Sequence, residues 1–209
     1  MQFFIDELNK ILPPEFTDQT KSRLRDGLSQ FHKSNLNNDK YYTEFYLSNC
    51  NSYFLQGDLI KELRFPVFNP DNRQYEKLYY DALIISNTCD IDDANKRNVP
   101  KNAVLAKVIT FDSFVETLNE LDNVESAAEI LTQIKNQQFS NIIYLPPTKN
   151  NIDYIAYLDD FSIIDIKELN VLKNDIDQNR IESLDYFGYY LFIFKLSYHF
   201  CRLPEETQR

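Results

Sequence analysis

Three stretches between Gln56 and Thr110 have the hydrophobic pattern of β-strands, and in the first of them Leu63, Phe65 and Val67 alternate with Arg64 and Pro66. Turn residues at 69–72 separate the first two apolar stretches and predict a hairpin, because Pro70 presets its φ angle and Asn and Asp tolerate turn conformations. The second stretch ends in a continuous apolar run, which is typical of a strand buried on both faces. The pattern therefore predicts three successive strands, at 59–68, 75–85 and 102–110.

Apolar residues recur with a helical period toward both ends of the chain and after the third predicted strand. Two amino-terminal helices are predicted to form a hairpin within residues 1–40, with Thr17 as the N-cap of the second helix. The last predicted helix is aromatic and aliphatic on every side, which indicates burial along much of its length. The predicted helices cover 2–12, 18–33, 111–119, 125–138 and 180–202.

Further β segments surround these helices. Strand patterns are predicted from Tyr41 onward, at 141–145, and as a pair at 154–158 and 161–166 joined by Asp159-Asp160. Five or six strands with short connections favour an α+β fold, namely a small SH3-like antiparallel barrel over about 41–170. We expect residues 41–209 to form one compact unit with a helical insertion at 111–138 and a carboxy-terminal helix. The amino-terminal hairpin is expected to be attached to this unit.

Composition and charge exclude several classes of function. The net charge is −10 and the pI is about 4.7, which argues against broad nucleic-acid binding through Lys and Arg. The chain holds only 3 Gly and no glycine-rich phosphate loop. Its 3 Cys are widely spaced, which favours free thiols in a reducing compartment, so we expect a cytoplasmic protein without a membrane span. No cofactor or metal is predicted.

A small polar cluster at the end of the second central strand is the candidate site. Cys89 could be a nucleophile if a neighbouring cation stabilised its thiolate, or a small core residue, with Asp90 capping the next turn. The ends of neighbouring strands are expected to bring Asp58 and the pair Cys89-Asp90 to a common pocket. A hard-cation site formed by Asp58, Asp90, Asp92 and Asp93 is the alternative interpretation.

Arg180 stands at the start of the last predicted helix, where a positive charge is unfavourable with the helix dipole. It is therefore predicted to have a carboxylate partner, either Asp58 or Asp90, with contact to a ligand as the alternative. The aromatic residues of this helix could stack on bases, but their density on all sides favours core packing.

Three segments of the chain resemble the MazF/PemK (Kid-like) toxins: Gly57-Asp58-Leu59, Leu83 to Asn87 and Val104 to Thr110. The resemblance implies an SH3-like barrel that cleaves single-stranded RNA and is neutralised by an antitoxin protein. It also implies that Thr110 occupies the position of an active-site Thr or Ser. Where that family has Arg-Pro, this chain has Tyr80 and Asp81, so Arg64 or Arg73 would have to supply the positive charge that the reaction needs.

A narrower resemblance, to uncharacterised bacterial proteins, rests on four segments: Gln56-Gly57-Asp58, Ser86 to Asp90, Leu145-Pro146-Pro147 and Arg180 to Leu184. The sequence thus leads to two hypotheses. The first is a toxin-like or phage-defence protein that acts on RNA as an endoribonuclease-like hydrolase and has an antitoxin or a defence component as its partner. The second is a non-catalytic protein-interaction module. The candidate catalytic residues of the first hypothesis are Asp58, Ser86, Cys89, Asp90, Thr110 and Arg180.

Overall fold

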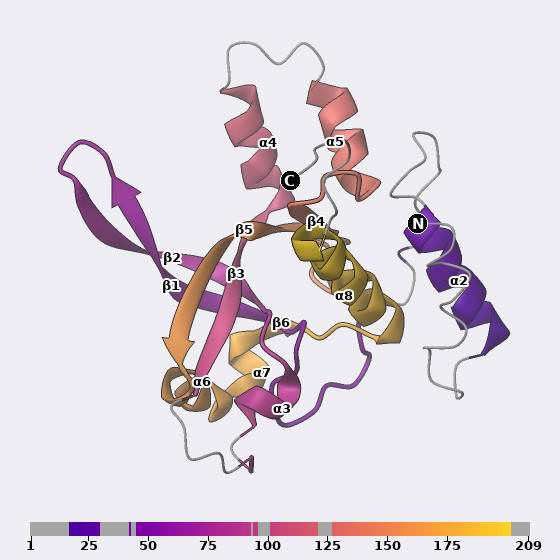
Figure 1. The fold of residues 1–209 in the computed structure, drawn as a ribbon, viewed down its shortest axis with the longest axis horizontal. Coiled ribbons are helices and arrows are strands. Elements are labelled where there is room, and N and C mark those ends of the chain that lie inside the picture. Colours follow the sequence, from indigo (N-terminus) through magenta and orange to yellow (C-terminus); the bar gives the residue numbers. More distant parts are fainter. Residues whose placement is uncertain are drawn as a thin grey trace, which may run out of the picture.

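The fold is organised around one antiparallel sheet (Figure 1). The computed structural model describes residues 17–29, 42, 45–92, 94–95, 101–120 and 127–201. The predicted helix at 2–12 and the loop after α2 lie outside these residues. The strands are β1 (Leu59–Asn69), β2 (Gln74–Ile84), β3 (Asn102–Thr110), β4 (Ile142–Leu145), β5 (Tyr154–Asp165) and β6 (Arg180–Glu182). The helices are α2 (Asp18–Ser29), α3 (Thr88–Ile91), α4 (Phe111–Asn119), α5 (Ala127–Lys135), α6 (Ile166–Lys173), α7 (Ile176–Asn179) and α8 (Tyr186–Cys201).

The sheet is open, with the strand order β4-β5-β3-β2-β1-β6. Its α+β class is as predicted, but a closed SH3-like barrel is not confirmed, because the ladders among the described strands leave β4 and β6 as edges. The sheet bends strongly, since Ser162 Oγ on β5 donates a hydrogen bond to the Arg64 carbonyl on β1 at 3.0 Å. These two strands are joined there by a side chain, although no ladder pairs them.

Two bulges create this bend. On β1, Lys61 and Glu62 stand opposite the single residue Asp81 of β2. On β5, the four residues 157–160 lie between the partners of Ala106 and Val108, so β3 has one residue where β5 has four. The predicted strand pair at 154–158 and 161–166 was therefore wrong: Asp159-Asp160 lies in a bulge of one continuous strand, not in a turn.

The predicted helix at 180–202 was wrong in its first turn and a half. Residues 180–182 form β6, which pairs with Leu59 and Ile60 of β1. The helix begins at Tyr186, because the Asp185 carboxylate accepts a hydrogen bond from the Gly188 amide at 2.9 Å and caps the first turn. Asp185 was the available sequence signal for this start. The β pattern at 41–47 likewise yields only an isolated bridge between Tyr46 and Leu184 among the described residues.

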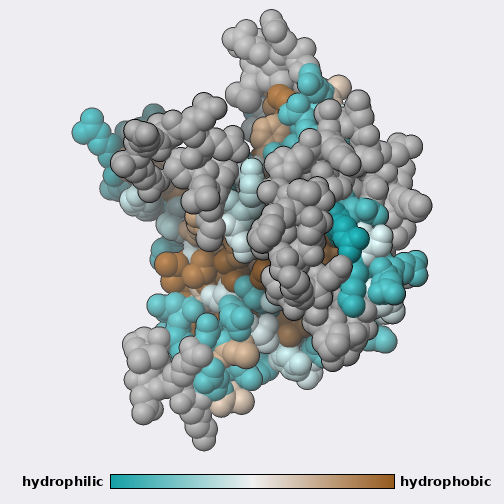
Figure 2. Space-filling view, turned by 45° about the vertical axis from the view of Figure 1, so that its right-hand side comes forward, coloured by the Kyte–Doolittle hydropathy of each residue, from teal (hydrophilic) through white to brown (hydrophobic). Residues whose placement is uncertain are grey.

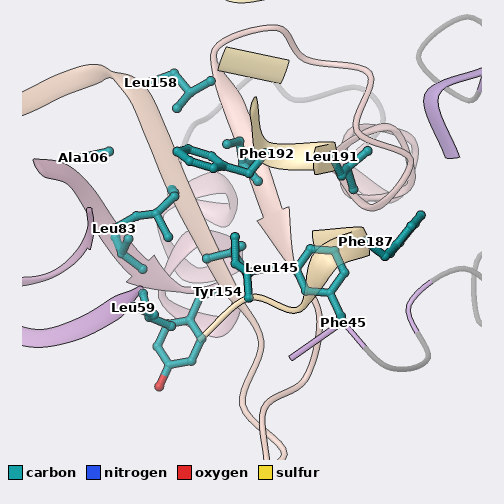
Figure 3. Close-up of a cluster of buried hydrophobic side chains, with 14 of the residues drawn as sticks. Phe45, Leu59, Leu83, Ala106, Leu145, Tyr154, Leu158, Phe187, Leu191 and Phe192 are labelled. Carbon is teal, nitrogen blue, oxygen red and sulfur yellow. The ribbon is translucent and has the colours of Figure 1, made fainter. Parts of the chain in front are cut away.

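Helix α8 covers one face of the sheet. Figure 3 shows Phe192 pointing from α8 toward sheet residues such as Leu83 and Leu158. Helix α2 packs on the outer side of α8: Leu24 belongs to the same core cluster, and the Arg23 guanidinium lies 4.3 Å from the centre of the Phe187 ring. The prediction of α2 and of its cap is confirmed, since Thr17 Oγ1 accepts a hydrogen bond from the Thr20 amide.

A second core cluster lies inside the bend of the sheet, under α3 and α6. It includes Ile60, Phe65, Ile84, Leu105 and Ile164. Away from this bend, β1 and β2 continue as an arm that projects from the body (Figure 1). On the face drawn in Figure 2, hydrophobic surface forms a band across the middle, with hydrophilic side chains below it. The arm and the bend together position the candidate site.

Candidate functional site

Asp58 lies at the centre of a buried polar cluster. Gly57 makes the preceding turn with φ of 88°, a conformation that glycine adopts without steric cost. The Asp58 carboxylate then accepts hydrogen bonds from Arg180 Nη1 at 3.1 Å, from the Leu55 amide at 3.0 Å and from Ser183 Oγ. The Arg180 and Asp58 side chains are 3% and 1% exposed, respectively. The predicted ion pair between them is confirmed, with Asp58 and not Asp90 as the partner.

Arg180 also ties down the irregular segment before β1. Its Nη1 donates to the Tyr53 carbonyl at 3.1 Å, and its Nη2 donates to the Asn51 carbonyl. Burial raises the pKa of the Asp58 carboxyl, whereas hydrogen bonds from Ser183 and Leu55 and the charge of Arg180 act in the opposite direction. Both charged groups are thus enclosed by protein, so their role is to hold β6 and the 51–58 segment on β1.

The strand-end cluster is more exposed than Asp58. Ser86 Oγ accepts a hydrogen bond from the Val104 amide at 2.8 Å and so fixes the end of β2 against β3. Asn87 caps the short helix α3, which carries Cys89 and Asp90, and the Cys89 side chain is exposed. The two segments do meet, because the Gln56 backbone amide donates a hydrogen bond to the side-chain Oγ1 of Thr88 at 2.9 Å. Asp58 is fully buried whereas Cys89 is exposed, so the two side chains differ in their access to solvent, and a pocket common to both stays a prediction.

The alternative hard-cation site is not supported by the described residues either. Asp58 is engaged with Arg180, and Asp93 lies outside the part of the chain that the structure describes. Among the described residues, no three His, Cys, Asp or Glu side chains are grouped so that they could hold a metal ion.

Thr110 lies elsewhere, in the lining of a surface hollow of about 550 Å³. The hollow lies where β2 and β3 diverge. Residues 81–84 of β2 pair with β3, whereas residues 74–80 of β2 turn away from β3 into the arm. Helix α4 closes the far side. We call this feature the tyrosine hollow; its lining residues are Glu62, Tyr79, Tyr80, Asp81, Lys107, Val108, Ile109, Thr110, Ser113, Thr117 and Tyr157.

Tyrosine rings and one lysine give the tyrosine hollow its chemical character. The Lys107 ammonium lies 4.5 Å from the centre of the Tyr80 ring and 5.6 Å from that of Tyr157. The same ammonium pairs with Asp160 at 2.9 Å, so its charge is balanced by the bulge of β5. Tyr79 is 63% exposed. On the far wall, Thr110 caps α4 and donates a hydrogen bond to Ser113 Oγ at 2.8 Å.

Two acids complete the tyrosine hollow at the bulge of β1. Glu62 has φ of 51°, an uncommon backbone conformation for a residue with a side chain. Its amide donates to Asp81 Oδ1 at 3.2 Å. Burial raises the pKa of the Asp81 carboxyl and is the largest effect. The hydrogen bond from the Glu62 amide lowers this pKa, the charge of Glu62 raises it, and the charge of Lys61 lowers it. Sequence reasoning missed Asp81 as a site residue, because its position on a strand gives no sign of the bulge opposite.

Lys195 is a buried amine that the sequence pattern also concealed, because it stands in the middle of an apolar helix. It is 1% exposed and donates hydrogen bonds to the Gln137 carbonyl at 3.1 Å and to Gln137 Oε1 at 2.8 Å. Gln137, in turn, binds both the amide and the carbonyl of Tyr144. Burial holds the pKa of the Lys195 ammonium well below its ordinary value of 10.5. Lys195 thus fastens α8 to the turn after α5.

Replacing Lys195 by Met is expected to alter the pH dependence of stability. Because the folded pKa is lowered, unfolding takes up protons, and the wild-type free energy of unfolding gains from this group as pH rises toward 10.5. Lys195→Met removes that gain. The stability of the variant relative to wild type, measured by urea unfolding, should therefore be highest near pH 7 and fall toward pH 10. Lys167→Met, at an exposed position of α6, is the control, and a pH-independent difference would contradict the assignment.

The geometry defines an α+β protein with an open, bent antiparallel sheet and a tyrosine-lined hollow beside a projecting arm. Comparison with protein-family models and with curated proteins gives no significant match. None of the helices in the described ranges has the length and apolar character needed to cross a membrane.

Proposed function

We propose that this protein is a protein-interaction module of a defence or regulatory complex, and that its contact surface is the tyrosine hollow together with the adjoining arm. The observation that carries the proposal is the open hollow of about 550 Å³, walled by Tyr79, Tyr80 and Tyr157 at the base of the arm. Exposed tyrosines supply large contact areas with a polar tip, and they are enriched in protein interfaces.

The arm extends this surface. Phe68 and Tyr75, both exposed, contact each other edge to face across the hairpin at 5.4 Å between ring centres. Clustered exposed apolar side chains rimmed by charges are typical of interaction sites. Two of the groups that a hydrolase of the predicted kind would use are engaged elsewhere, since Arg180 and Asp58 are buried against each other.

An RNA-directed, toxin-like activity of the MazF/PemK kind is the second candidate. Thr110, the residue to which the resemblance assigns a catalytic role, lies in the tyrosine hollow with Tyr80, Asp81 and Lys107. In this candidate, the bent sheet is an SH3-like barrel that has lost its closure. Both candidates place the protein in the cytoplasm, since the free thiols of Cys50 and Cys89 suit a reducing compartment.

Site-specific photocrosslinking tests the proposal. A benzoylphenylalanine at position 79 is expected to give a discrete protein adduct in expressing cells. The same group at Val171, an exposed apolar position on α6, should not give this adduct. The combined substitutions Phe68→Ser and Tyr75→Ser should remove it. If position 79 gives neither a protein nor an RNA adduct, both candidates are wrong.

A nuclease-sensitive adduct at position 79 would instead favour the second candidate. In that case, cleavage of single-stranded RNA should be lost in Thr110→Asn, which keeps a side chain able to cap α4 but removes the hydroxyl. Circular dichroism checks that the variant is folded. Retained cleavage in Thr110→Asn would exclude the catalytic role of Thr110.

A further inference from the structure

We infer that the tyrosine hollow receives a positively charged side chain, arginine by preference, from an extended segment of the partner protein. This inference rests on the proposed function and specifies the chemistry of its partner. It follows from three features: the charges of the tyrosine hollow, its tyrosine rings, and an edge of β2 that pairs with no described strand.

The charges of the tyrosine hollow favour a cation. Glu62 and Asp81 line it, and Lys107 is the one cation among the described lining residues. Because Lys107 pairs with Asp160 at 2.9 Å, the positive charge of Lys107 is balanced by Asp160 and does not balance Glu62 and Asp81. Burial and the charges of Asp159 and Asp160 also raise the pKa of Tyr157, as expected where the potential is negative. A phosphate or an acidic peptide would be repelled here, whereas an arginine or lysine would be attracted.

The rings offer a surface on which a guanidinium group can lie. The Lys107 ammonium lies over the rings of Tyr80 and Tyr157, at 4.5 and 5.6 Å from their centres, so a cation of the chain itself already occupies those two faces and an incoming guanidinium would stack on Tyr79. Tyr79 adds an exposed ring at the mouth. A planar guanidinium stacks on aromatic faces and forms paired hydrogen bonds with carboxylates, which an ammonium group does not do. This geometry therefore favours arginine over lysine.

The edge of β2 accounts for the extended segment. Between Gln74 and Tyr80, the only strand that pairs with β2 among the described residues is β1. The other edge of β2 runs directly into the tyrosine hollow at Asp81. An extended peptide can add to such an edge through main-chain hydrogen bonds while alternate side chains enter adjacent pockets. A segment paired along 74–80 would thus present a side chain to the tyrosine hollow.

The test is an NMR titration of protein carrying labelled tyrosine rings. The probe is the peptide acetyl-Thr-Val-Arg-Val-Thr-amide, compared with peptides in which citrulline or glutamate replaces the arginine. The arginine peptide is expected to shift the ring resonances of Tyr79, Tyr80 and Tyr157 in a saturable manner. Citrulline, which has nearly the same shape without the charge, should weaken binding about tenfold or more.

Protein variants give the matching control. The double variant Glu62→Gln and Asp81→Asn should bind the arginine peptide about tenfold more weakly or worse, whereas Glu168→Gln, at an exposed acid of α6, should bind it as wild type does. Equal binding of the arginine and citrulline peptides would overturn the inference, and so would tighter binding of a uridine pentanucleotide at the same rings. If position 79 crosslinks to a protein but none of the peptides shifts these rings, the proposed function stands and the inference about its partner fails.

Discussion

Arg180→Met is expected to reduce the free energy of unfolding by about 3–5 kcal/mol, because it leaves the buried Asp58 carboxylate without its partner. The substitution also removes the donors to the Asn51 and Tyr53 carbonyls. Chemical denaturation followed by circular dichroism measures the loss. Arg64→Met, which removes an exposed arginine from β1, should change the stability by only about 0.5 kcal/mol or less.

The loss should depend on pH in a direction that identifies Asp58. Without Arg180, the folded pKa of Asp58 rises further above its ordinary value of 3.8, because burial is then opposed only by the Ser183 and Leu55 hydrogen bonds. A carboxyl with a raised folded pKa stabilises the fold at low pH and loses that contribution as pH rises. Arg180→Met should therefore be less destabilising at pH 5 than at pH 8, and Asp58→Asn in the same chain should reduce this pH dependence. An equal loss at both pH values would mean that Asp58 does not carry the effect.

Phe192→Ala is expected to cost about 3–5 kcal/mol, because it leaves a cavity between α8 and the sheet that the surrounding strands cannot fill. Phe192 is 1% exposed and lies in the main core cluster with Leu83 and Leu158 (Figure 3). The backbone of α8 cannot move far to close the space, because it already approaches Phe45 closely: a Cβ on Gly188 would lie 2.6 Å from the Phe45 carbonyl oxygen.

Tyr186→Ala provides the matched control on the same helix. Tyr186 is 68% exposed, so its truncation should change the stability by about 0.5 kcal/mol or less. Thermal unfolding of both variants and wild type under one condition measures the contrast. Similar losses in the two variants would show that α8 does not pack on the sheet as described.

The central strands could be predicted because the hydrophobic pattern is local. The predicted third strand at 102–110 and the helix at 111–119 agree with β3 and α4, and the hairpin of β1 and β2 has its turn where Pro70 and its neighbours place it. A carboxylate partner for Arg180 was also predicted, and Asp58 was one of the two alternatives given, but the argument from a helix start was wrong. The pair forms because β6 buries Arg180, not because of a helix dipole.

The sequence by itself determined the α+β class, most element positions and the acidic, glycine-poor character of the chain, since each depends on residues near one another or on composition. Only the tertiary structure decided that the sheet stays open, that Asp58 is buried whereas Cys89 is exposed, and that Asp81, Lys107 and Thr110 line one hollow. The physical reason is that two bulges set the register and bend of the strands, and a bulge arises from how two strands meet. Arg180 and Asp58, 122 residues apart in sequence, are neighbours for the same reason.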